Sequence, residues 1–327
     1  MAAYSKTNSE LWTGRKSDQQ LYLHEKVECV AFEGLNFYPS QKILALLGYA
    51  CEEGVKRNQG RLGAAEGPDA IRKQLAKMPN HLATEIRLID VGTIQCLDGD
   101  MEAAQNSLTE KVVQLLANNA FPIVLGGGHD VAYGHYNGIK KYLGKHTSVG
   151  IINFDAHFDL RNNKKDNNSG TPFYQIAQDS TSADSPFEYL CLGIRKDTND
   201  TILFQTAKDF KVNYIENEHF NIRYWNRIEK KLQQFIKEVD HIYTTIDLDG
   251  FSSAFAPGVS AASPMGFSPD VVLECLKSII DSGKFISLDI AEMNPKYDID
   301  THTAKLAASL VHFVMLRLGA VRNLPKN

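Results

Sequence analysis

Three short polar segments, each directly following an apolar run, set the strongest constraint on how this chain can fold. They are Gly126-Gly127-Gly128-His129-Asp130, Asp155-Ala156-His157-Phe158-Asp159 and Asp247-Leu248-Asp249. The runs before them, 121–125, 148–154 and 241–246, are rich in Val, Ile, Tyr and Phe, which is typical of strands buried on both faces. In open parallel α/β sheets, sites form where loops converge at the carboxyl ends of strands. We therefore expect the three segments to meet at one edge of a sheet.

The two histidines and four carboxylates in these segments form a metal-ligand set. Alternate side chains of a strand share one face, so Asp155, His157 and Asp159 are expected to point the same way. The same spacing applies to Asp247 and Asp249. Oxygen donors with some imidazole suit manganese, with iron, cobalt or zinc as alternatives. Crowded carboxylates without cations would raise one another's pKa values, so electrostatics favours two divalent ions.

Each motif alone has an ordinary structural explanation. A lone Asp-x-Asp, or a histidine after glycines, is more often a turn, a helix cap or a buried polar group. The glycine run also suits a tight strand-to-helix turn. It lacks the Lys-Ser/Thr of a phosphate-binding loop and has no GxGxxG spacing, so nucleotide binding is not expected. Three such segments at three predicted strand ends favour the metal site.

The rest of the chain alternates predicted strands and helices, which indicates an α/β fold. Apolar runs predict eight strands, at 42–48, 86–91, 121–126, 148–155, 188–194, 211–215, 241–248 and 284–290. Residues 101–116 and 301–318 carry apolar side chains three and four apart, as amphipathic helices do. This order predicts a mostly parallel eight-stranded sheet with helices on both sides, in a single-domain three-layer sandwich.

The domain organisation and the main loops also follow from these patterns. Residues 36–327 are expected to form the catalytic domain, and residues 1–35 an N-terminal extension packed on it. Polar stretches at 162–170, 178–186 and 251–266 are predicted to be loops on the ligand side of the sheet. The first of them is a candidate for a loop that closes over a bound substrate.

Four ordered blocks of the sequence resemble the ureohydrolases, the arginase and agmatinase superfamily. They are GGGHD at 126–130, DAHFD at 155–159, DLDG at 247–250 followed by APGVS at 256–260, and SLDIAEMNP at 287–295. The stretch GRLGAAEGPDAIR at 60–72 is similar to the family's early glycine-rich turn and helix. The resemblance covers most of the chain and implies an arginase-like fold.

The resemblance implies that two Mn²⁺ ions per subunit are held by six residues. These are His129, Asp155, His157, Asp159, Asp247 and Asp249. Bridging is expected from Asp159 or Asp155 and from Asp247. Two metal ions lower the pKa of a shared water, which then attacks a planar, cationic, amidine-like carbon. Glu292 is expected to pair with the substrate's cationic nitrogens, and Asp289 to orient a ligating histidine.

Departures from the arginase pattern resemble the formimidoylglutamases, the histidine-degradation branch of the family. Arginases carry a proton-shuttling histidine after a serine-glycine pair, whereas this chain has Thr171-Pro172 after Ser169-Gly170. The third block reads DGFSSAFAPG where arginases have an aspartate-proline turn, and the opening WTGR at 12–15 also resembles that branch. Without the histidine, either Asp159 or solvent is expected to protonate the leaving amine, or the substrate needs less help to expel it.

This branch implies N-formimidoyl-L-glutamate as the substrate, with L-glutamate and formamide as products. Because the substrate carries two carboxylates, positive donors are expected at the rim of the pocket. Arg161, two residues after the DAHFD block, is the leading candidate because its planar guanidinium matches a carboxylate. Asn58 and Arg195 are weaker candidates. Arg57 and Arg61 are also weaker, since an exposed charge is the ordinary state of an arginine.

Two alternatives stay open. Agmatine or a guanidino acid as the substrate would make the chain a ureohydrolase that releases urea. Arg161 separates these substrates, because agmatine has no carboxylate for it to bind. A noncatalytic, ureohydrolase-like protein is the second alternative, but the complete set of six donors argues against it.

Composition restricts the partners and the compartment. A net charge of −4 over 327 residues gives no reason to expect nucleic acid or an anionic membrane as a partner, and no apolar run approaches the length of a membrane span, about 18 residues. Residues 1–15 lack the apolar core of a signal peptide. Five scattered cysteines indicate free thiols in a reducing compartment. We expect a cytoplasmic enzyme acting on a small molecule. Because relatives commonly form trimers or hexamers, we also expect a homo-oligomer.

Overall fold

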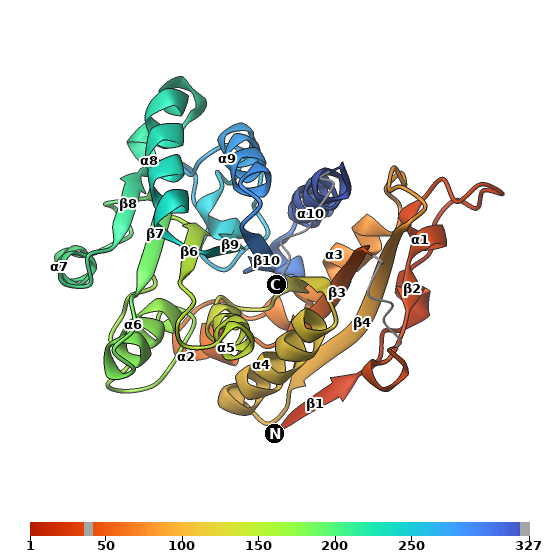
Figure 1. Cartoon of the computed structure of the whole chain (residues 1–327), viewed down its shortest axis with the longest axis horizontal. Coiled ribbons are helices and arrows are strands. Elements are labelled where there is room, and N and C mark those ends of the chain that lie inside the picture. The colour runs from red at the N-terminus through yellow and green to blue at the C-terminus, as the bar shows by residue number, and fades with distance from the viewer. Residues whose placement is uncertain (36–41, 321–327) are drawn as a thin grey trace.

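The computed structural model describes residues 1–35 and 42–320, which form one central sheet between two layers of helices (Figure 1). The strands are β1 (Ala2–Ser5), β2 (Glu28–Cys29), β3 (Lys42–Ala50), β4 (Ile86–Cys96), β5 (Ala120–Leu125), β6 (Val149–Phe154), β7 (Glu188–Ile194), β8 (Asn213–Glu216), β9 (His241–Asp247) and β10 (Phe285–Ala291). The helices are α1 (Leu23–Lys26), α2 (Glu53–Arg57), α3 (Gly67–Leu75), α4 (Met101–Ala117), α5 (Val131–Leu143), α6 (Pro172–Ser182), α7 (Thr201–Asp209), α8 (Trp225–Glu238), α9 (Pro269–Asp281) and α10 (His302–Ala320). The predicted domain boundary, between residues 35 and 36, adjoins residues 36–41, which lie outside the described residues, as do residues 321–327.

The strands follow the order β1-β4-β3-β5-β10-β9-β6-β7-β8 across the sheet, with β2 paired to β4. The eight strands from β3 to β10 pair in parallel with one another, which confirms the predicted α/β architecture. The antiparallel β1 and the two-residue β2 lie beside β4 and extend the sheet beyond the eight predicted strands. Because β5, β10, β9 and β6 are parallel neighbours, their carboxyl ends meet at the same edge.

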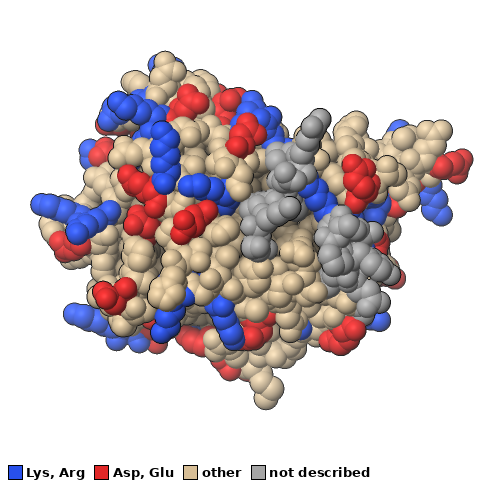
Figure 2. Space-filling model, in the orientation of Figure 1, with Lys and Arg blue, Asp and Glu red and all other residues tan. Residues whose placement is uncertain are grey.

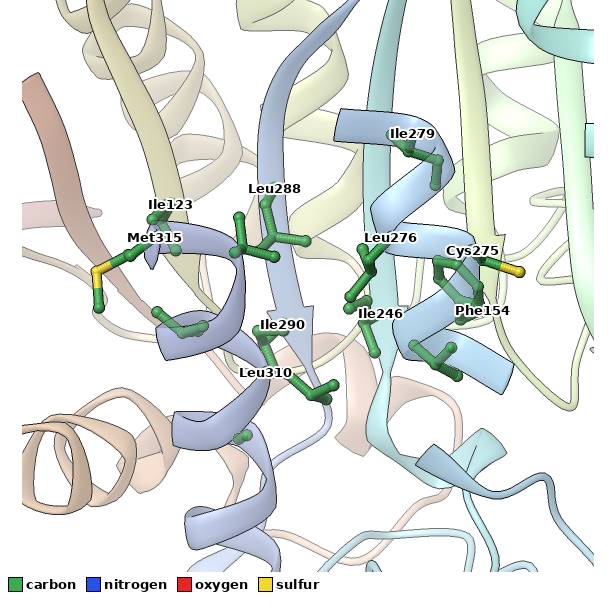
Figure 3. Close-up of a cluster of buried hydrophobic side chains, with 14 of the residues drawn as sticks. Ile123, Phe154, Ile246, Cys275, Leu276, Ile279, Leu288, Ile290, Leu310 and Met315 are labelled. Carbon is green, nitrogen blue, oxygen red and sulfur yellow. The ribbon is translucent and has the colours of Figure 1, made fainter. Parts of the chain in front are cut away.

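Different helices cover the two faces of the sheet, α3 and α8–α10 on one and α4–α6 on the other (Figure 1). β10 is buried along its whole length because its alternating side chains face both layers. In Figure 3, Leu288 and Ile290 of β10 pack beneath Leu276 of α9 and Leu310 of α10. Ile286 belongs to the core cluster of the opposite layer. This double burial explains the continuous apolar character of the central strands.

Within residues 1–35 and 42–320, α10 is the one helix long and apolar enough to cross a membrane. Half of the residues in its most apolar window, 50%, are buried inside the protein. The buried side chains, which include Ala307, Val311 and Val314, belong to the core cluster beneath α3 and α9. The position of α10 in the core therefore accounts for its apolar composition.

One of the predicted loops is wrong. Residues 178–182 belong to α6, and residues 183–187 lead from α6 to the amino end of β7, on the edge opposite the ligand side. A crossover helix returns the chain to the start of the next parallel strand, so the connection after it lies at that far edge. The polar residues 178–182 form the C-terminal end of this helix, whose inner face carries Phe173, Ile176 and Ala177.

A buried ion pair ties the N-terminal segment to the sheet. Arg72 of α3 donates to both carboxylate oxygens of Asp90 in β4, at 2.8 and 2.9 Å, and neither side chain is exposed. The same carboxylate accepts hydrogen bonds from Trp12 Nε1 and Thr7 Oγ1. Asp90 therefore links α3, the edge of the sheet and the N-terminal residues.

Replacing Arg72 with Met is expected to lower the free energy of unfolding by about 3–5 kcal/mol, because Asp90 would remain buried without its counter-ion. Arg317→Met, which removes a surface ion pair with Asp281, is a matched control and should cost about 1 kcal/mol or less. Urea denaturation followed by circular dichroism measures both changes. Equal, small losses in the two variants would contradict the role assigned to Arg72.

Candidate metal centre

Four neighbouring strands bring the polar residues of the site to one edge of the sheet. His129 follows β5, the segment 155–159 follows β6, Asp247 ends β9, Asp249 lies in the short 3-10 turn Leu248–Gly250, and Glu292 follows β10. All six donors predicted from the sequence thus come from adjacent strand ends. The parallel sheet is the physical reason why segments so distant in sequence approach one another.

The six donors form two overlapping groups. The ligand atoms of His129, Asp155, Asp159 and Asp247 all lie within 4.8 Å of one another, and so do those of Asp155, His157 and Asp249. Asp155 belongs to both groups, because its Oδ2 lies 3.3 Å from His129 Nδ1 and its Oδ1 lies 3.3 Å from His157 Nδ1. Two adjacent sets of donors with one shared carboxylate could hold a pair of neighbouring cations.

Several polar atoms of the cluster are buried without a hydrogen-bond partner among the described residues. They are His129 Nδ1, Asp249 Oδ1 and Glu292 Oε2. His129 Nδ1 lies only 2.9 Å from Asp159 Oδ2 and 3.0 Å from Asp247 Oδ2, yet it forms no hydrogen bond with either. Buried polar atoms nearly always have a partner. Two of these atoms, His129 Nδ1 and Asp249 Oδ1, are potential metal ligands, and a bound cation would give each of them a partner. The residues present therefore fit a metal centre.

Burial, together with the charges of neighbouring carboxylates, raises the pKa values of three acidic groups of the site. Burial, followed by the charge of Asp155, raises the pKa of Asp159 to about 6. Burial and the charge of Asp247 raise the pKa of Asp249 well above its usual range, and burial with both of these aspartates does the same for Glu292. Bound divalent cations would oppose this repulsion and keep the carboxylates ionised.

The donors converge for a different reason from the one predicted. β6 ends before Asp155, so residues 155–159 form a loop and do not alternate as a strand would. Asp155 Oδ1 accepts a hydrogen bond from His157 N at 2.7 Å, and Asp247 Oδ1 accepts one from Asp249 N at 2.8 Å. In both turns a carboxylate accepts from the backbone amide two residues later. These turns, and not strand alternation, gather the side chains.

The glycine run allows β5 to approach its neighbours closely. A Cβ atom on Gly127 would lie 1.9 Å from Cys51 O, so no larger residue fits. Gly128 N donates to Cys51 O at 2.9 Å, and Glu292 N donates to Gly127 O at 2.8 Å. Glu292 Oε1 in turn accepts from His129 N at 2.9 Å. The turn therefore fixes Glu292 beside His129.

A relay behind His129 was missed by the sequence analysis. His129 Nε2 lies 3.0 Å from Thr245 Oγ1, which donates to Asp289 Oδ1 at 2.5 Å. Since Thr245 gives its only hydrogen to Asp289, its oxygen accepts from Nε2–H, and His129 Nδ1 keeps a lone pair facing the donors. Asp289 thus orients the histidine indirectly. The available signal was Thr245 itself, a polar residue two positions before Asp247 in an apolar run.

A cavity of about 340 Å³ opens over the donors and is also lined by Asn58, Arg161 and Glu292. The Arg161 guanidinium forms no hydrogen bond or ion pair with the part of the chain that the structure describes, so it is available to an anion. Asn58 Nδ2 donates to Ser169 Oγ at 3.2 Å on the same wall. Arg195 does not line this cavity, because its guanidinium pairs with Asp197 at 3.0 and 2.5 Å. Arg161 and Asn58 are therefore placed to contact a molecule in the cavity, whereas Arg195 is not.

Comparisons with known proteins agree with these features. The model of the arginase family matches residues 42–316, which confirms the family predicted from the motifs. The chain is 42% identical over 316 residues to formimidoylglutamase of Aeromonas salmonicida, across 95% of this chain and 99% of that protein. Formimidoylglutamase of Bacillus subtilis has a similar fold, with a TM-score of 0.81 and 22% identity over 94% of this chain and 95% of that one. So does Trypanosoma cruzi formiminoglutamase with Mn2+2, with a TM-score of 0.76 and 23% identity over 88% of this chain and 96% of that one.

Replacing Asp247 with Ala is expected to weaken binding of divalent cations without unfolding the protein, because Asp247 belongs to the donor cluster and not to the apolar core. Equilibrium dialysis against manganese(II) chloride, followed by elemental analysis, should find fewer ions than in the unchanged protein, with the same circular dichroism. Asp240→Asn, just before the amino end of β9, where Asp240 accepts from Ser148 N, is the control and should bind as many ions as the unchanged protein. An undiminished ion content in Asp247→Ala would contradict the ligand assignment.

Proposed function

The chain belongs to the arginase family, and within that family we propose that it is a formimidoylglutamase. It hydrolyses the C–N bond of N-formimidoyl-L-glutamate, a linear amidine, and yields L-glutamate and formamide in histidine degradation. The nearly full-length match to a formimidoylglutamase carries the proposal. The complete donor set and the cavity above it support the same activity.

Within this proposal, two Mn²⁺ ions per subunit are held by the six donors. The residues that hold them are His129, Asp155, His157, Asp159, Asp247 and Asp249. Bound there, the ions supply a water nucleophile by lowering its pKa toward neutrality. A donor set of four carboxylates and two imidazoles suits manganese, and the solved Trypanosoma cruzi relative contains Mn2+2. Cys191 is buried near His157 O at 3.4 Å but belongs to neither donor group.

Glu292 is the residue proposed to orient the reacting group. Its Oε1 is occupied by His129 N, whereas Oε2 is buried and has no partner among the described residues. A planar, cationic formimidoyl group could donate a charge-assisted hydrogen bond to Oε2. This contact would hold the amidine carbon over the donor cluster in a fixed orientation.

Arg161 and Asn58 are proposed to bind the carboxylates of the glutamate portion. Both line the cavity, and Gly170 leaves room for the Arg161 stem, since a Cβ there would lie 3.0 Å from Arg161 Cδ. Arg61 also lines the cavity, but its guanidinium donates to Ser260 O at 2.8 Å. Arg161 therefore has the greater capacity for a bidentate contact with a carboxylate.

Asp159 is proposed to carry the proton to the departing amine. Its side chain is 12% exposed, compared with 0% for Asp155, 3% for Asp247 and 7% for Asp249. Of the four carboxylates it is thus the one most open to the cavity. It can accept the proton that the attacking water loses and pass it to the leaving nitrogen.

The two alternatives are less well supported. Agmatine has no carboxylate for the guanidinium of Arg161, which lines the cavity and has no partner among the described residues. A noncatalytic member of the family would have little reason to keep six donors whose burial is unfavourable without cations. Both alternatives are outcomes of the turnover measurement described below.

The same proposal includes a small-molecule substrate, a cytoplasmic location and a homo-oligomeric assembly. All five cysteines are free thiols, which supports a reducing compartment. Figure 2 shows Lys and Arg interspersed with Asp and Glu on the face that it draws, with no continuous basic patch there. That face gives no support for nucleic acid as a partner. The oligomeric state is testable by analytical ultracentrifugation of the purified chain.

A turnover panel with manganese-loaded protein tests the proposed function. N-formimidoyl-L-glutamate should be hydrolysed to formamide with a kcat/KM about 100-fold above that for agmatine, arginine or guanidinobutyrate, on the scale of one or two charge-assisted contacts. Separate assays for formamide and urea identify the bond that is cleaved. Preferred release of urea would establish the ureohydrolase alternative, and no turnover of any compound would favour the noncatalytic one.

Replacing Arg161 with Ala is expected to raise KM for N-formimidoyl-L-glutamate by about 10- to 100-fold and to change kcat less, because a charge-assisted contact remote from the reacting carbon is lost. Lys164→Ala is the matched control, since Lys164 lies in the same loop but does not line the cavity over the donors. Steady-state kinetics measure both variants. An unchanged KM in Arg161→Ala would assign carboxylate binding to another residue.

A further inference from the structure

A fully buried histidine, His135 of α5, lies directly behind the relay of Thr245 and Asp289. His135 Nδ1 is 2.6 Å from Asp289 Oδ2, and its Nε2 is 2.6 Å from Ser287 Oγ. Tyr243 OH donates to the same oxygen of Asp289. None of these residues lines the cavity over the donors. The reaction proposed above therefore assigns no direct role to His135.

The hydrogen-bond pattern determines how many protons His135 carries. Ser287 has one hydroxyl hydrogen and donates it to Pro122 O at 2.9 Å, because a carbonyl oxygen only accepts. Ser287 Oγ must therefore accept from His135 Nε2–H. On the other side of the ring, the Asp289 carboxylate accepts from Nδ1–H. Both ring nitrogens act as donors, which only the charged imidazolium form permits.

The charge on His135 compensates the buried carboxylate beside it. Asp289 and His135 are both 0% exposed, and a buried carboxylate without a counter-ion is strongly unfavourable. Burial and the nearby charge of Asp289 raise the pKa of Tyr243 well above its usual range, so Tyr243 remains a donor. With Thr245, Tyr243 and His135 all donating to it, Asp289 is held as a carboxylate that only accepts.

The pairing of β9 with β10 connects this network to His129 through Thr245. Asp289 of β10 is paired with Thr245 of β9, and Ser287 of β10 is paired with Tyr243 of β9. Since alternate residues of a strand share a face, the polar side chains of both strands point toward α5. Because Asp289 can only accept, the Thr245 hydroxyl must donate its hydrogen to Asp289. The Thr245 oxygen then accepts a hydrogen bond from Nε2–H of His129.

We propose that His135, with a hydrogen on both ring nitrogens, is a positioning residue for the metal centre. Its imidazolium holds Asp289 as an acceptor, Asp289 aligns Thr245, and Thr245 holds the His129 tautomer whose Nδ1 lone pair faces the donors. This inference rests on the proposed function, because it concerns the same site. Its first test, however, requires neither turnover nor a bound metal.

That first test is the protonation of His135 in the unchanged protein. Histidine labelled with ¹⁵N on the ring and recorded by proton–nitrogen correlation at neutral pH should show a directly bonded hydrogen on both nitrogens of His135. The signal is assigned by its shift in Tyr243→Phe, which removes one donor to Asp289. A ring nitrogen of His135 without a hydrogen would overturn the proposal.

The second test separates the charge of His135 from its hydrogen bond. His135→Asn can still donate to Asp289 but carries no charge, and His135→Phe can do neither. Affinity for manganese(II), measured by titration with manganese(II) chloride, should fall by about 10- to 100-fold in His135→Phe, the usual range for partners behind a metal ligand, and should also fall in His135→Asn. His312→Asn is the control, because its ring contacts Pro79 O far from the site.

The kinetic readout distinguishes positioning from substrate contact. The His135 variants should lose kcat at limiting manganese while KM for N-formimidoyl-L-glutamate stays unchanged, since His135 does not line the cavity. Unaltered manganese affinity in His135→Asn would refute a role for the charge, and a change in KM alone would refute positioning. If the protein does not hydrolyse this substrate, the proposed function fails, but the nuclear magnetic resonance and manganese titrations still decide the role of His135.

Discussion

The structure depends on holding several carboxylates close together against their mutual repulsion. Asp155, Asp159 and Asp247 surround His129 within 4.8 Å, and this cluster is largely withdrawn from solvent. Such a cluster is unfavourable unless cations are bound, so the scaffold must prevent the side chains from separating. The scaffold is the centre of a parallel sheet, where β5, β10, β9 and β6 are each paired on both sides. Strand ends held in this way cannot move apart without breaking the hydrogen bonds of the ladder.

The two faces of the sheet contribute differently to the site. Toward α9 and α10 the central strands present an apolar surface, with Leu288 and Ile290 of β10 as examples (Figure 3). Toward α5 the same strand presents Ser287 and Asp289, which bond to His135. The first face supplies the apolar burial that stabilises the domain. The second carries a hydrogen-bonded network to the back of the donor cluster, where each buried polar group needs a partner.

The parallel sheet and the donor set could be predicted from sequence because both depend on local patterns. Doubly buried strands read as continuous apolar runs, and the donors stand immediately after them. The turns that hold the donors could not be predicted from sequence. The spacing of the donors predicted that each strand continues through them, whereas Asp249 lies in a 3-10 turn and residues 155–159 form a loop after β6. The sequence also could not show which side chains pair with one another in the fold. Arg195 was a weaker candidate than Arg161 for binding a carboxylate, and only the structure shows that Asp197 occupies its guanidinium. Only the pairing of β9 with β10 connects Thr245 to Asp289.

Two of the residues to which chemistry is assigned have strained backbones, and the packing around them explains how the strain is tolerated. Asp159 and Glu292 have φ angles of +48° and +64°, in the left-handed region that non-glycine residues rarely adopt. Each such residue costs about 1 kcal/mol or more and persists only where its surroundings hold it. Asp159 stands between Phe158 and Leu160, whose exposures are 0% and 1%, and Glu292 follows Ala291, which is fully buried at the end of β10. The apolar neighbours remain in the core, so the reversed backbone between them turns each carboxylate away from the core and into the cavity.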